Sequence, residues 1–338
     1  MHQITDAARH HDTAPAVRAP RQTYATVHRL PTRSERPERC GPTRRPGRAR
    51  GRRPTTAFVL TGGAALGAAQ AGMLRALYER GISPDMLVGA SVGALNAAFV
   101  ASRPQAPATA DELARIWASI ERHDVFPLDV TRVIGGLFGR RDHVVGAHAL
   151  RRIVRRHLGF DDLAQAPIPL HVAAYDPASG REVLLSSGPA VDSLMAATAI
   201  PGVLPPVSVG GRRLVDASVV SGAPISHAVS LGAERIYVLP TRDRPRATCG
   251  LPRTAIDAAL VALGARTAEA LRADVARHAK DAEVILLPAP SDHALQPTDF
   301  AHARQLTFEA LSDARAALAR VRAGARRPVH LYAVPPSG

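Results

Sequence analysis

Between Thr55 and about Ser102 the chain runs twice from a short apolar strand, through a turn of small residues, directly into a helix. The first strand covers about 56–61 and its helix about 67–80, while the second strand, 85–88, leads into a helix that ends near Ser102. A strand that leads straight into a helix, twice in succession, is typical of a parallel sheet covered by helices. The repeat therefore predicts an α/β fold.

The same alternation continues over the rest of the chain. We expect further strands at about 168–174, 181–186, 203–209, 212–216, 234–239 and 283–287. We expect further helices at about 109–122, 146–158, 189–199, 224–231, 253–279 and 299–322. Since the chain shows no internal repeat and no linker in its second half, residues 55–325 are predicted to form one domain, followed by a C-terminal tail at 326–338.

The first 54 residues differ from the rest in composition. They hold thirteen arginines and four acidic residues, so +9 of the net charge of +14 lies there. With seven prolines and one aromatic residue, this segment cannot bury enough apolar surface to offset the entropy of ordering, and we predict a disordered tail over 1–54. Such a tail would be attracted to anionic lipid or nucleic acid, but a solvated leader or a misassigned start is the simpler interpretation. The remaining chain has no basic strip interleaved with aromatic residues, so we predict no specific nucleic-acid partner.

Several classes of protein do not fit the sequence. No run approaches the roughly 18 to 20 apolar residues that a membrane span needs, and the N-terminus lacks the apolar region of a secretory signal. Cys40 and Cys249 are too few for a disulfide scaffold or a cysteine zinc site, which agrees with a reducing compartment. The fourteen histidines show no metal-ligand spacing. We predict a cytoplasmic protein without a metal.

A G-x-S-x-G pattern, Gly89-Ala90-Ser91-Val92-Gly93, lies directly between the second strand and its helix. A serine on such a sharp turn points its hydroxyl out of the sheet, and the flanking glycines permit the unusual backbone and a close helix crossing. The N-terminus of the helix adds unpaired N–H groups that favour a developing negative charge. Ser91 is therefore a candidate nucleophile, with an ordinary helix N-cap serine as the alternative.

A second turn of small residues, Thr61-Gly62-Gly63-Ala64-Ala65-Leu66-Gly67, joins the first strand to its helix. Small residues let backbone N–H groups approach an anion at a helix N-terminus, whether phosphate or oxyanion. Dinucleotide binding is disfavoured because Ala64 replaces the second glycine of G-x-G-x-x-G and no acid ends the second strand. A tight turn without a ligand is the remaining alternative.

A third candidate, Leu214-Val215-Asp216-Ala217-Ser218, places an acid at the end of a short strand. Its carboxylate could accept the Ser91 proton directly if the fold brings the two within about 3 Å. A lone aspartate at a strand end is more often a turn former, so this motif gains meaning only together with the other two.

Together these residues resemble the patatin-like phospholipase family. Its G-x-S-x-G turn matches Gly89 to Gly93, its G-G-G-x-R/K-G segment aligns with Gly62 to Gly67, and its D-G-G/A motif aligns with Asp216 to Ser218. Gly180 to Gly188 and Ala197 to Pro206 are also similar to family segments, as is Pro224 through Val238. The resemblance extends over about residues 55–325 and implies a three-layer α/β/α fold with a central, mostly parallel sheet.

The resemblance also implies a mechanism. Ser91 would be the nucleophile and Asp216 the base of a Ser–Asp dyad that cleaves acyl esters of phospholipids, lysophospholipids or neutral lipids. The oxyanion hole would be formed by backbone N–H groups of Gly62, Gly63, Ala64 and Ala65, with that of Val92. No metal or organic cofactor is implied, and the partner is a lipid or acyl-ester substrate.

Four residues depart from the family pattern. Ala64 stands at the third glycine, Leu66 at the basic position, and Ala217 and Ser218 at the glycines of the acid motif. The Cβ of Ala64 narrows the oxyanion approach only if its backbone needs a positive φ. A catalytically weakened family member is therefore one alternative.

A Ser-Asp-His triad in an ordinary α/β-hydrolase is the nearest alternative mechanism, with His227 as its histidine. In that fold several strands precede the nucleophile, whereas Ser91 follows the second strand of the predicted domain. His227 lies in a helical stretch, where we expect a partly exposed side chain.

Residues 124–141 combine apolar side chains such as Phe126 and Phe138 with arginines. This pattern suits an interfacial flap that contacts a membrane peripherally, and a covering helix packed on the core is the alternative. Trp117 is predicted to lie in the core.

Overall fold

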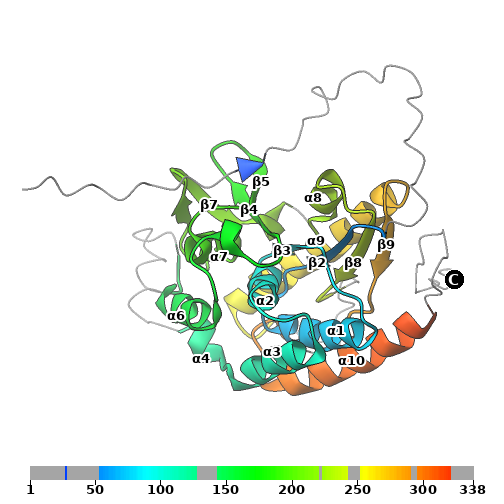
Figure 1. Cartoon of the computed structure of the whole chain (residues 1–338). Helices are drawn as coiled ribbons and strands as arrows, with labels where there is room; N and C mark the ends of the chain where they lie inside the picture. Colours follow the sequence, from blue (N-terminus) through cyan, green and yellow to red (C-terminus); the bar gives the residue numbers. More distant parts are fainter. Residues whose placement is uncertain are drawn as a thin grey trace, which may run out of the picture.

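The computed structural model describes residues 27–28, 53–127, 143–220, 223–242, 252–290 and 295–320 of the 338-residue chain. In these ranges one mixed sheet runs through the molecule in the strand order β1-β5-β4-β3-β2-β8-β9, with β7 also paired to β4 and β6 to β7 (Figure 1). The parallel centre consists of β4 (Leu170–Asp176), β3 (Met86–Ala90), β2 (Thr56–Leu60), β8 (Arg235–Leu239) and β9 (Glu283–Leu286). The antiparallel strands are β1 (Val27–His28), β5 (Arg181–Leu185), β6 (Val207–Val209) and β7 (Arg212–Asp216).

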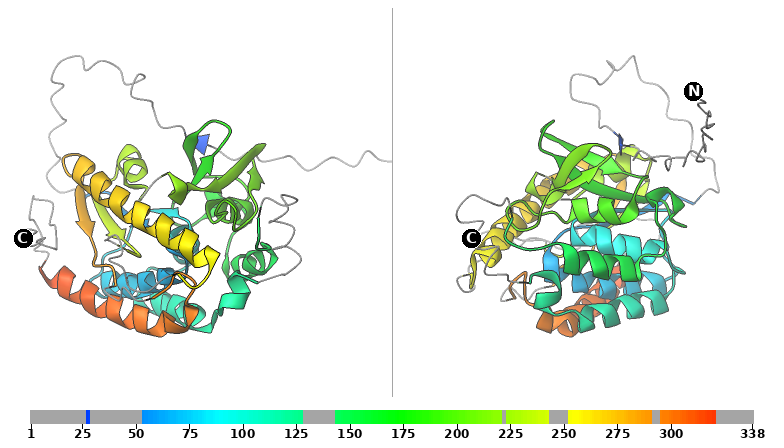
Figure 2. Two further views of the ribbon diagram at one scale, coloured as in Figure 1. Left: turned by 180° about the vertical axis from the view of Figure 1, so that it is seen from behind. Right: turned by 90° about the vertical axis from the view of Figure 1, so that its left-hand side faces the viewer.

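Helices cover both faces of this sheet, so the predicted three-layer α/β/α fold is confirmed (Figures 1 and 2). One face carries α1 (Ala68–Glu79), α2 (Val92–Ala101), α3 (Pro107–Ser119), α6 (His148–His157), α7 (Ala190–Ala197) and α10 (Ala303–Arg320). The other carries α8 (Ile225–Ser230) and much of α9 (Ala255–His278). Short helical turns are η1 (Ala64–Gly67), α4 (Arg122–Val125), η2 (Leu163–Gln165), η3 (Ala217–Val219) and η4 (Phe300–His302).

Strand β2 shows how the sheet supplies two cores. Phe58 and Leu60 point into the core beneath α1, while Ala57 and Val59 point into the core beneath α8, and all four are fully buried. Successive side chains of a strand point to opposite faces, so a strand covered on both sides must be apolar throughout. This explains why the central strands are continuous apolar runs rather than alternating ones.

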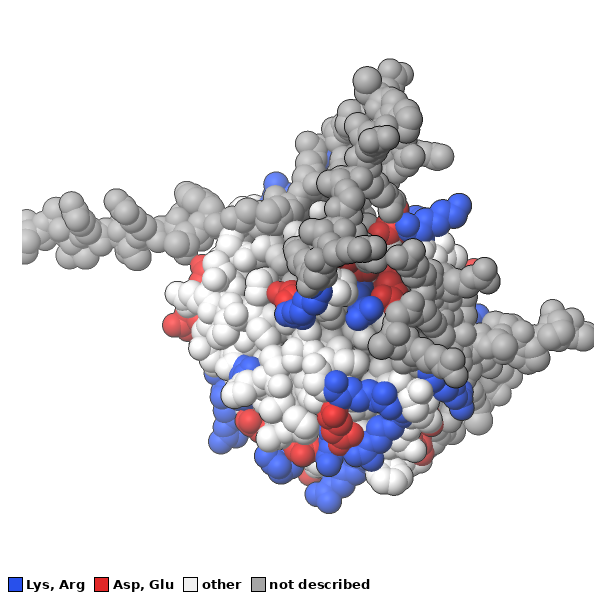
Figure 3. Space-filling model, turned by 45° about the vertical axis from the view of Figure 1, so that its right-hand side comes forward, with Lys and Arg blue, Asp and Glu red and all other residues white. Residues whose placement is uncertain are grey.

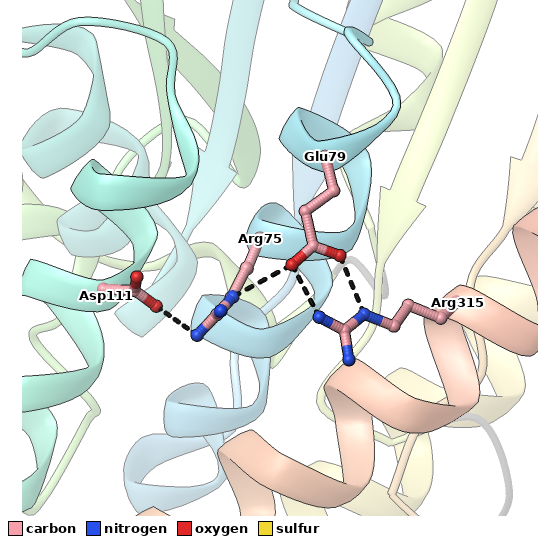
Figure 4. Close-up of polar contacts among 4 residues, drawn as sticks. All are labelled: Arg75, Glu79, Asp111 and Arg315. Atoms are coloured by element: carbon pink, nitrogen blue, oxygen red, sulfur yellow. Dashed lines mark hydrogen bonds and ion pairs between the residues drawn. The ribbon is translucent and has the colours of Figure 1, made fainter.

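Helices α1, α3 and α10 form a packed layer on one side. Gly72 of α1 lies so close to α10 that a Cβ on it would be 2.1 Å from the Thr307 carbonyl oxygen. At the edge of this layer Arg75 contacts Glu79 at 3.1 Å and Asp111 at 2.7 Å, and Arg315 also contacts Glu79 (Figure 4). The hydrogen bond from Arg315 lowers the pKa of Glu79; burial acts in the opposite direction, and Arg75 adds a weaker lowering effect. This exposed network ties three helices together, although such pairs each stabilise a fold only slightly.

Charge is mixed on one face of the domain. On the face drawn in Figure 3, Lys and Arg side chains lie among Asp and Glu side chains rather than in one basic patch. Among the described residues, no helix is long and apolar enough to cross a membrane.

Most residues of the two predicted tails lie outside the described ranges. Within 1–54, Val27–His28 pair antiparallel with Leu184–Leu185 at the edge of β5, where backbone groups are open to pairing. Disorder of the remaining tail stays a prediction. The rest of that segment up to residue 52, the C-terminal tail at 326–338, and both cysteines lie outside the described residues. Of the predicted flap, only 124–127 is described, and Phe126 there is buried against Phe300.

Candidate active site

Ser91 occupies the junction between β3 and α2. Its backbone has φ 53° and ψ −132°, a conformation that side-chain-bearing residues rarely adopt and that stores strain at functional sites. The two glycines of the motif make this turn possible through close approach. A Cβ on Gly89 would lie 2.5 Å from Ala94 Cα, and one on Gly93 would lie 2.3 Å from the Leu60 carbonyl oxygen. The G-x-S-x-G pattern therefore forms a sharp strand-to-helix turn, as predicted from its context.

The glycine-rich turn at the end of β2 lies directly beside Ser91. A Cβ on Gly62 would be 2.8 Å from Ser91 Cβ and 2.8 Å from the Ser218 hydroxyl oxygen. Three segments that are far apart in the sequence therefore meet at Gly62. The sheet explains why two of these segments, the glycine-rich turn and the serine turn, lie side by side. Leu60 is paired with Gly89 in parallel register, so β2 and β3 end at the same edge of the sheet.

Asp216 reaches the same place through the antiparallel part of the sheet. It pairs with Ala174 of β4, whose neighbour Ala173 pairs with Ala90 of β3. The backbone of Asp216 thus lies two strand spacings, roughly 10 Å, from the serine turn. Its carboxylate reaches the hydroxyl of Ser91 across this distance. Strand β7 ends at Asp216, and η3 begins at the next residue.

Asp216 is fully buried, and its two oxygens differ. Oδ1 accepts the Ser218 N–H at 2.8 Å, whereas Oδ2 is buried without a hydrogen-bond donor in the described part of the chain. Burial raises the pKa of Asp216 from 3.8 to about 6, although the nearby hydroxyl of Ser91, followed by the N–H and hydroxyl of Ser218, acts in the opposite direction. The carboxylate is thus more basic than an exposed one and still largely ionised at neutral pH.

Ala64 has the positive φ at which, from the sequence, its Cβ is expected to narrow the approach to the oxyanion hole. Its φ is 51°, so the position requires the left-handed backbone that favours glycine. Ala64 also lines two pockets that contain Ser91. The turn itself is held by Thr241, which follows β8. Its N–H donates to Thr61 Oγ1 at 3.0 Å and its hydroxyl donates to the Gly62 carbonyl oxygen.

The proposed oxyanion donors are not equivalent. The Ala65 N–H donates to the Pro297 carbonyl oxygen at 2.9 Å, so it is already engaged. The N–H groups of Gly62, Gly63 and Ala64 donate no hydrogen bond within the described ranges. Val92 is the first residue of α2, where N–H groups have no partner in the helix. Within the described part of the chain, four of the five predicted donors are therefore available to an anion, and Ala65 is not.

A buried polar network beneath the turn was not predicted. Asn96 of α2 donates to the Gly67 carbonyl oxygen and to Gln70 Oε1, and it accepts the Trp117 N–H at 3.0 Å. Gln70 in turn donates to the carbonyl oxygens of Thr61 and Leu239, both at 2.9 Å. The network joins the glycine-rich turn to the helix that carries Ser91. One signal for it is visible in the sequence, because polar residues at helix positions facing the core need buried partners.

An apolar pocket opens at Ser91. It runs between α2, α3, α6 and α7, and Trp117 lies in its wall as the predicted core residue, stacked on Phe300 with ring centroids 6.2 Å apart. Apart from Ser91 and His157, its described lining holds almost only aliphatic and aromatic side chains, with Asn96 and Thr198 as neutral polar groups.

His227 lies elsewhere. It is 1% exposed on α8, with Nε2 3.4 Å from Glu182 Oε1, so the prediction of a partly exposed side chain is wrong. Ile225 and Ala228 of the same helix are buried with it, so His227 lies on the covered side of α8. His227 lines neither of the pockets that contain Ser91. Among the described residues, no group of three His, Cys, Asp or Glu is placed to hold a metal ion.

Comparison with known proteins supports the same interpretation. The family model of patatin-like phospholipases matches residues 58–229, a span that includes the glycine-rich turn, Ser91 and Asp216. The chain belongs to the patatin-like phospholipase family. This family membership confirms the resemblance inferred from the three motifs.

Individual relatives are more distant. An uncharacterised NTE family protein of Mycobacterium bovis is 30% identical over 181 residues, 54% of this chain and 47% of the relative. A lysophospholipase of Aspergillus terreus is 26% identical over 189 residues, 54% of this chain and 12% of that protein. The chain thus spans less than half the length of these relatives.

Two solved structures are similar at low scores. VipD from Legionella pneumophila has a TM-score of 0.40 and 12% identity, covering 78% of this chain and 67% of that one. The human GIVD cytosolic phospholipase A2 in complex with methyl γ-linolenyl fluorophosphonate has the same score and identity, covering 78% and 58%.

Proposed function

We propose that this patatin-like protein is a serine acyl hydrolase that cleaves carboxylic esters of lipids through Ser91 and Asp216. The observation that carries the proposal is that three motifs meet at Gly62. A Cβ built on Gly62 would lie 2.8 Å from Ser91 Cβ and 2.8 Å from the Ser218 hydroxyl oxygen. A nucleophile, a buried carboxylate and available N–H groups around one point are the requirements of acyl transfer.

In the first half of the proposed reaction, Ser91 Oγ attacks the ester carbonyl carbon and its proton passes to Asp216. Oδ2 is the natural acceptor, because it has no hydrogen-bond donor among the described residues. The carbonyl oxygen becomes an oxyanion and takes hydrogen bonds from the N–H groups of Gly62, Gly63 and Ala64. The intermediate then expels the alcohol, which receives the proton from Asp216, and leaves an acyl group on Ser91.

In the second half, water attacks the acyl carbon and gives its proton to the same carboxylate. The fatty acid leaves when Ser91 recovers a proton, so the base is restored in each cycle. A single carboxylate with a pKa of about 6 suits both proton transfers, because this pKa is close enough to neutral pH for the group to accept a proton and to return it.

The pocket at Ser91 suits an acyl chain. Its lining residues come mainly from helices, and aliphatic and aromatic side chains contribute most of the surface. An alkyl chain entering it leaves water at roughly 25 cal/mol per Å² of apolar surface, which favours lipid esters over short polar ones. The lysophospholipase relatives act on substrates of this class by name, in agreement with the proposal.

The test is labelling and turnover of the full chain. A fluorophosphonate should label the wild type and not Ser91→Ala, and the same variant should lose hydrolysis of nitrophenyl and phospholipid esters. Ser218→Ala is the matched control, because this second hydroxyl also lies within reach of Gly62 but should not be the labelled group. Labelling that persists in Ser91→Ala, or none in the folded wild type, would contradict the proposal and favour a silent scaffold.

The triad alternative has its own test. If His227 were the base, His227→Ala would abolish ester hydrolysis as completely as Ser91→Ala does. We expect instead that Asp216→Ala abolishes turnover and His227→Ala retains it.

Peripheral contact with a lipid surface is a further part of the proposal, and loss of liposome flotation in Phe138→Asp would support it.

A further inference from the structure

The far end of the glycine-rich turn is held by a segment that lies much later in the sequence. The Ala65 N–H donates to the carbonyl oxygen of Pro297, which lies between β9 and η4. Residues 295–298 of this segment are all buried. Because burial keeps away the water that would compete for these backbone groups, the Pro297 carbonyl is a fixed acceptor for the turn.

The same segment borders the space around the candidate nucleophile. Pro297 lines one of the two pockets that contain Ser91, and Phe300, three residues later, lines the other. Phe300 also stacks on Trp117, so the end of the segment is fixed in the wall of the apolar pocket. The position of residues 295–300 therefore affects both the turn and the pocket beside it.

A buried carboxylate anchors this segment. Asp257 lies in the first turn of the 24-residue helix α9 (yellow in Figure 2) and is 1% exposed. The Thr298 hydroxyl donates to Asp257 Oδ1, and the Thr254 hydroxyl donates to Oδ2 at 2.8 Å. Thr254 is the N-cap of α9 and accepts the Asp257 N–H at 3.1 Å. Hydrogen bonds to a carboxylate are stronger than those between neutral groups, so Thr298 is held firmly to this helix.

Ala64 is the residue that needs such an anchor. It has the left-handed φ of 51°, and it stands where the family pattern has glycine. For an alanine this conformation is disfavoured by roughly 5- to 30-fold relative to the right-handed one. The hydrogen bond from Ala65 to Pro297 holds the peptide that directly follows Ala64. A change of φ at Ala64 would strain or break this hydrogen bond.

Relaxation of Ala64 would redirect an N–H group of the proposed oxyanion hole. Helix α1 after the turn is fixed, because its Gly72 packs directly against α10. A change of φ therefore has to turn the peptide before Ala64. That peptide is planar and carries the Gly63 carbonyl, which accepts the Leu66 N–H at 3.1 Å, and the Ala64 N–H on its opposite side. Turning it moves the Ala64 N–H away from the point that the other donors share.

We propose that Asp257 and Thr298 are positioning residues, which act through Pro297 to keep Ala64 in its left-handed conformation and so aim the oxyanion donors. The inference rests on the proposed function and adds two residues to it. Neither side chain lines a pocket that contains Ser91, so both hold the turn without touching the substrate. The restraint that a glycine would make unnecessary is supplied here by the later segment.

The experiment measures kcat and KM of the full chain for a nitrophenyl ester. Thr298→Val keeps the shape of the side chain without its hydroxyl and should lower kcat about 10- to 100-fold, with KM within about twofold. Thr298→Ser restores the hydroxyl and should recover most of kcat. Thr109→Val is the matched control, because Thr109 is equally buried and its hydroxyl donates to the Pro104 carbonyl oxygen at 2.6 Å, away from the turn. It should leave kcat unchanged.

Ala64→Gly separates the positioning role from a general structural one. Glycine adopts a positive φ without the penalty of alanine, so the turn should depend less on its anchor. Thr298→Val should therefore cost at least roughly threefold less in kcat when combined with Ala64→Gly than when made alone. If Thr298→Val does not fold, Asp257→Asn takes its place, because an amide oxygen and an amide NH2 cannot both accept the two hydroxyl donors.

The outcomes distinguish this inference from the proposed function. Unchanged kcat in Thr298→Val, or equal losses with and without Ala64→Gly, would overturn the inference, while Ser91-dependent turnover of the wild type would still support the proposed function. Amide hydrogen exchange of residues 61–67 needs no substrate. It should be faster in Thr298→Val than in the wild type and in Thr109→Val, and unchanged exchange would overturn the inference even if no ester is hydrolysed.

Discussion

Replacing Asp216 by asparagine is expected to make the protein more stable and inactive at the same time. The folded-state pKa of about 6 is above the unfolded value of 3.8, which means that the native protein binds the proton more tightly than the unfolded chain does. Folding at neutral pH must therefore keep a charge in a fully buried position. An asparagine side chain at this position would occupy the same volume, accept the Ser218 N–H through its amide oxygen and carry no charge.

The magnitude follows from the two pKa values. A raised carboxyl pKa contributes full stability below pH 3.8, and that contribution is lost as the pH rises through 6. The resulting destabilisation of the wild type is below roughly 1 kcal/mol at pH 4, grows through pH 5 and 6, and reaches roughly 3 kcal/mol at pH 7 and above. The free energy of unfolding of Asp216→Asn should therefore exceed that of the wild type by an amount that grows with pH in the same way.

The assay is urea unfolding at pH 4, 5, 7 and 8, with the free energy of unfolding extrapolated to water for both proteins. Ser91→Ala is the matched control, because it is equally inactive but keeps the carboxylate; without the Ser91 hydroxyl its pH-dependent penalty should be at least as large as that of the wild type. A difference between Asp216→Asn and the wild type that stays constant from pH 4 to pH 8, or that has the opposite sign at pH 8, would refute the burial argument. Such a result would also remove the reason to regard Asp216 as an unusually basic carboxylate.

Three further predictions concern residues around the site. His227→Ala should retain kcat/KM but lower the free energy of unfolding by about 1–3 kcal/mol, since it removes a buried side chain and leaves Glu182 without its neighbour; loss of turnover with normal stability would point to the triad. Ala64→Gly should raise stability by up to about 1 kcal/mol in thermal unfolding, because it relieves a positive φ, and a loss of stability would contradict this. Asn96→Leu should cost about 2–4 kcal/mol and lower kcat, because the Trp117 N–H and other buried partners lose their hydrogen bonds; wild-type stability would show that the network is dispensable.

Much of the architecture could be predicted because it depends on local pattern. The apolar run that becomes β2 and the small-residue turn after it are visible in the sequence, and most predicted elements lie within a few residues of those observed. The strand predicted at 203–209 is shorter, since only Val207–Val209 pair with β7. The conformation of Ser91 was also predictable, because two glycines at fixed spacing between a strand and a helix leave few backbone paths.

The order of amino acids thus establishes the alternation of strands and helices and the identity of the three motifs. Which of their atoms can act on a substrate depends on the folded chain: the Ala65 N–H donates to the Pro297 carbonyl oxygen, and His227 is buried beside Glu182. This division arises because secondary structure follows short-range periodicity, whereas hydrogen-bond partners, burial and pKa depend on segments that come together only when parallel strands pair in register.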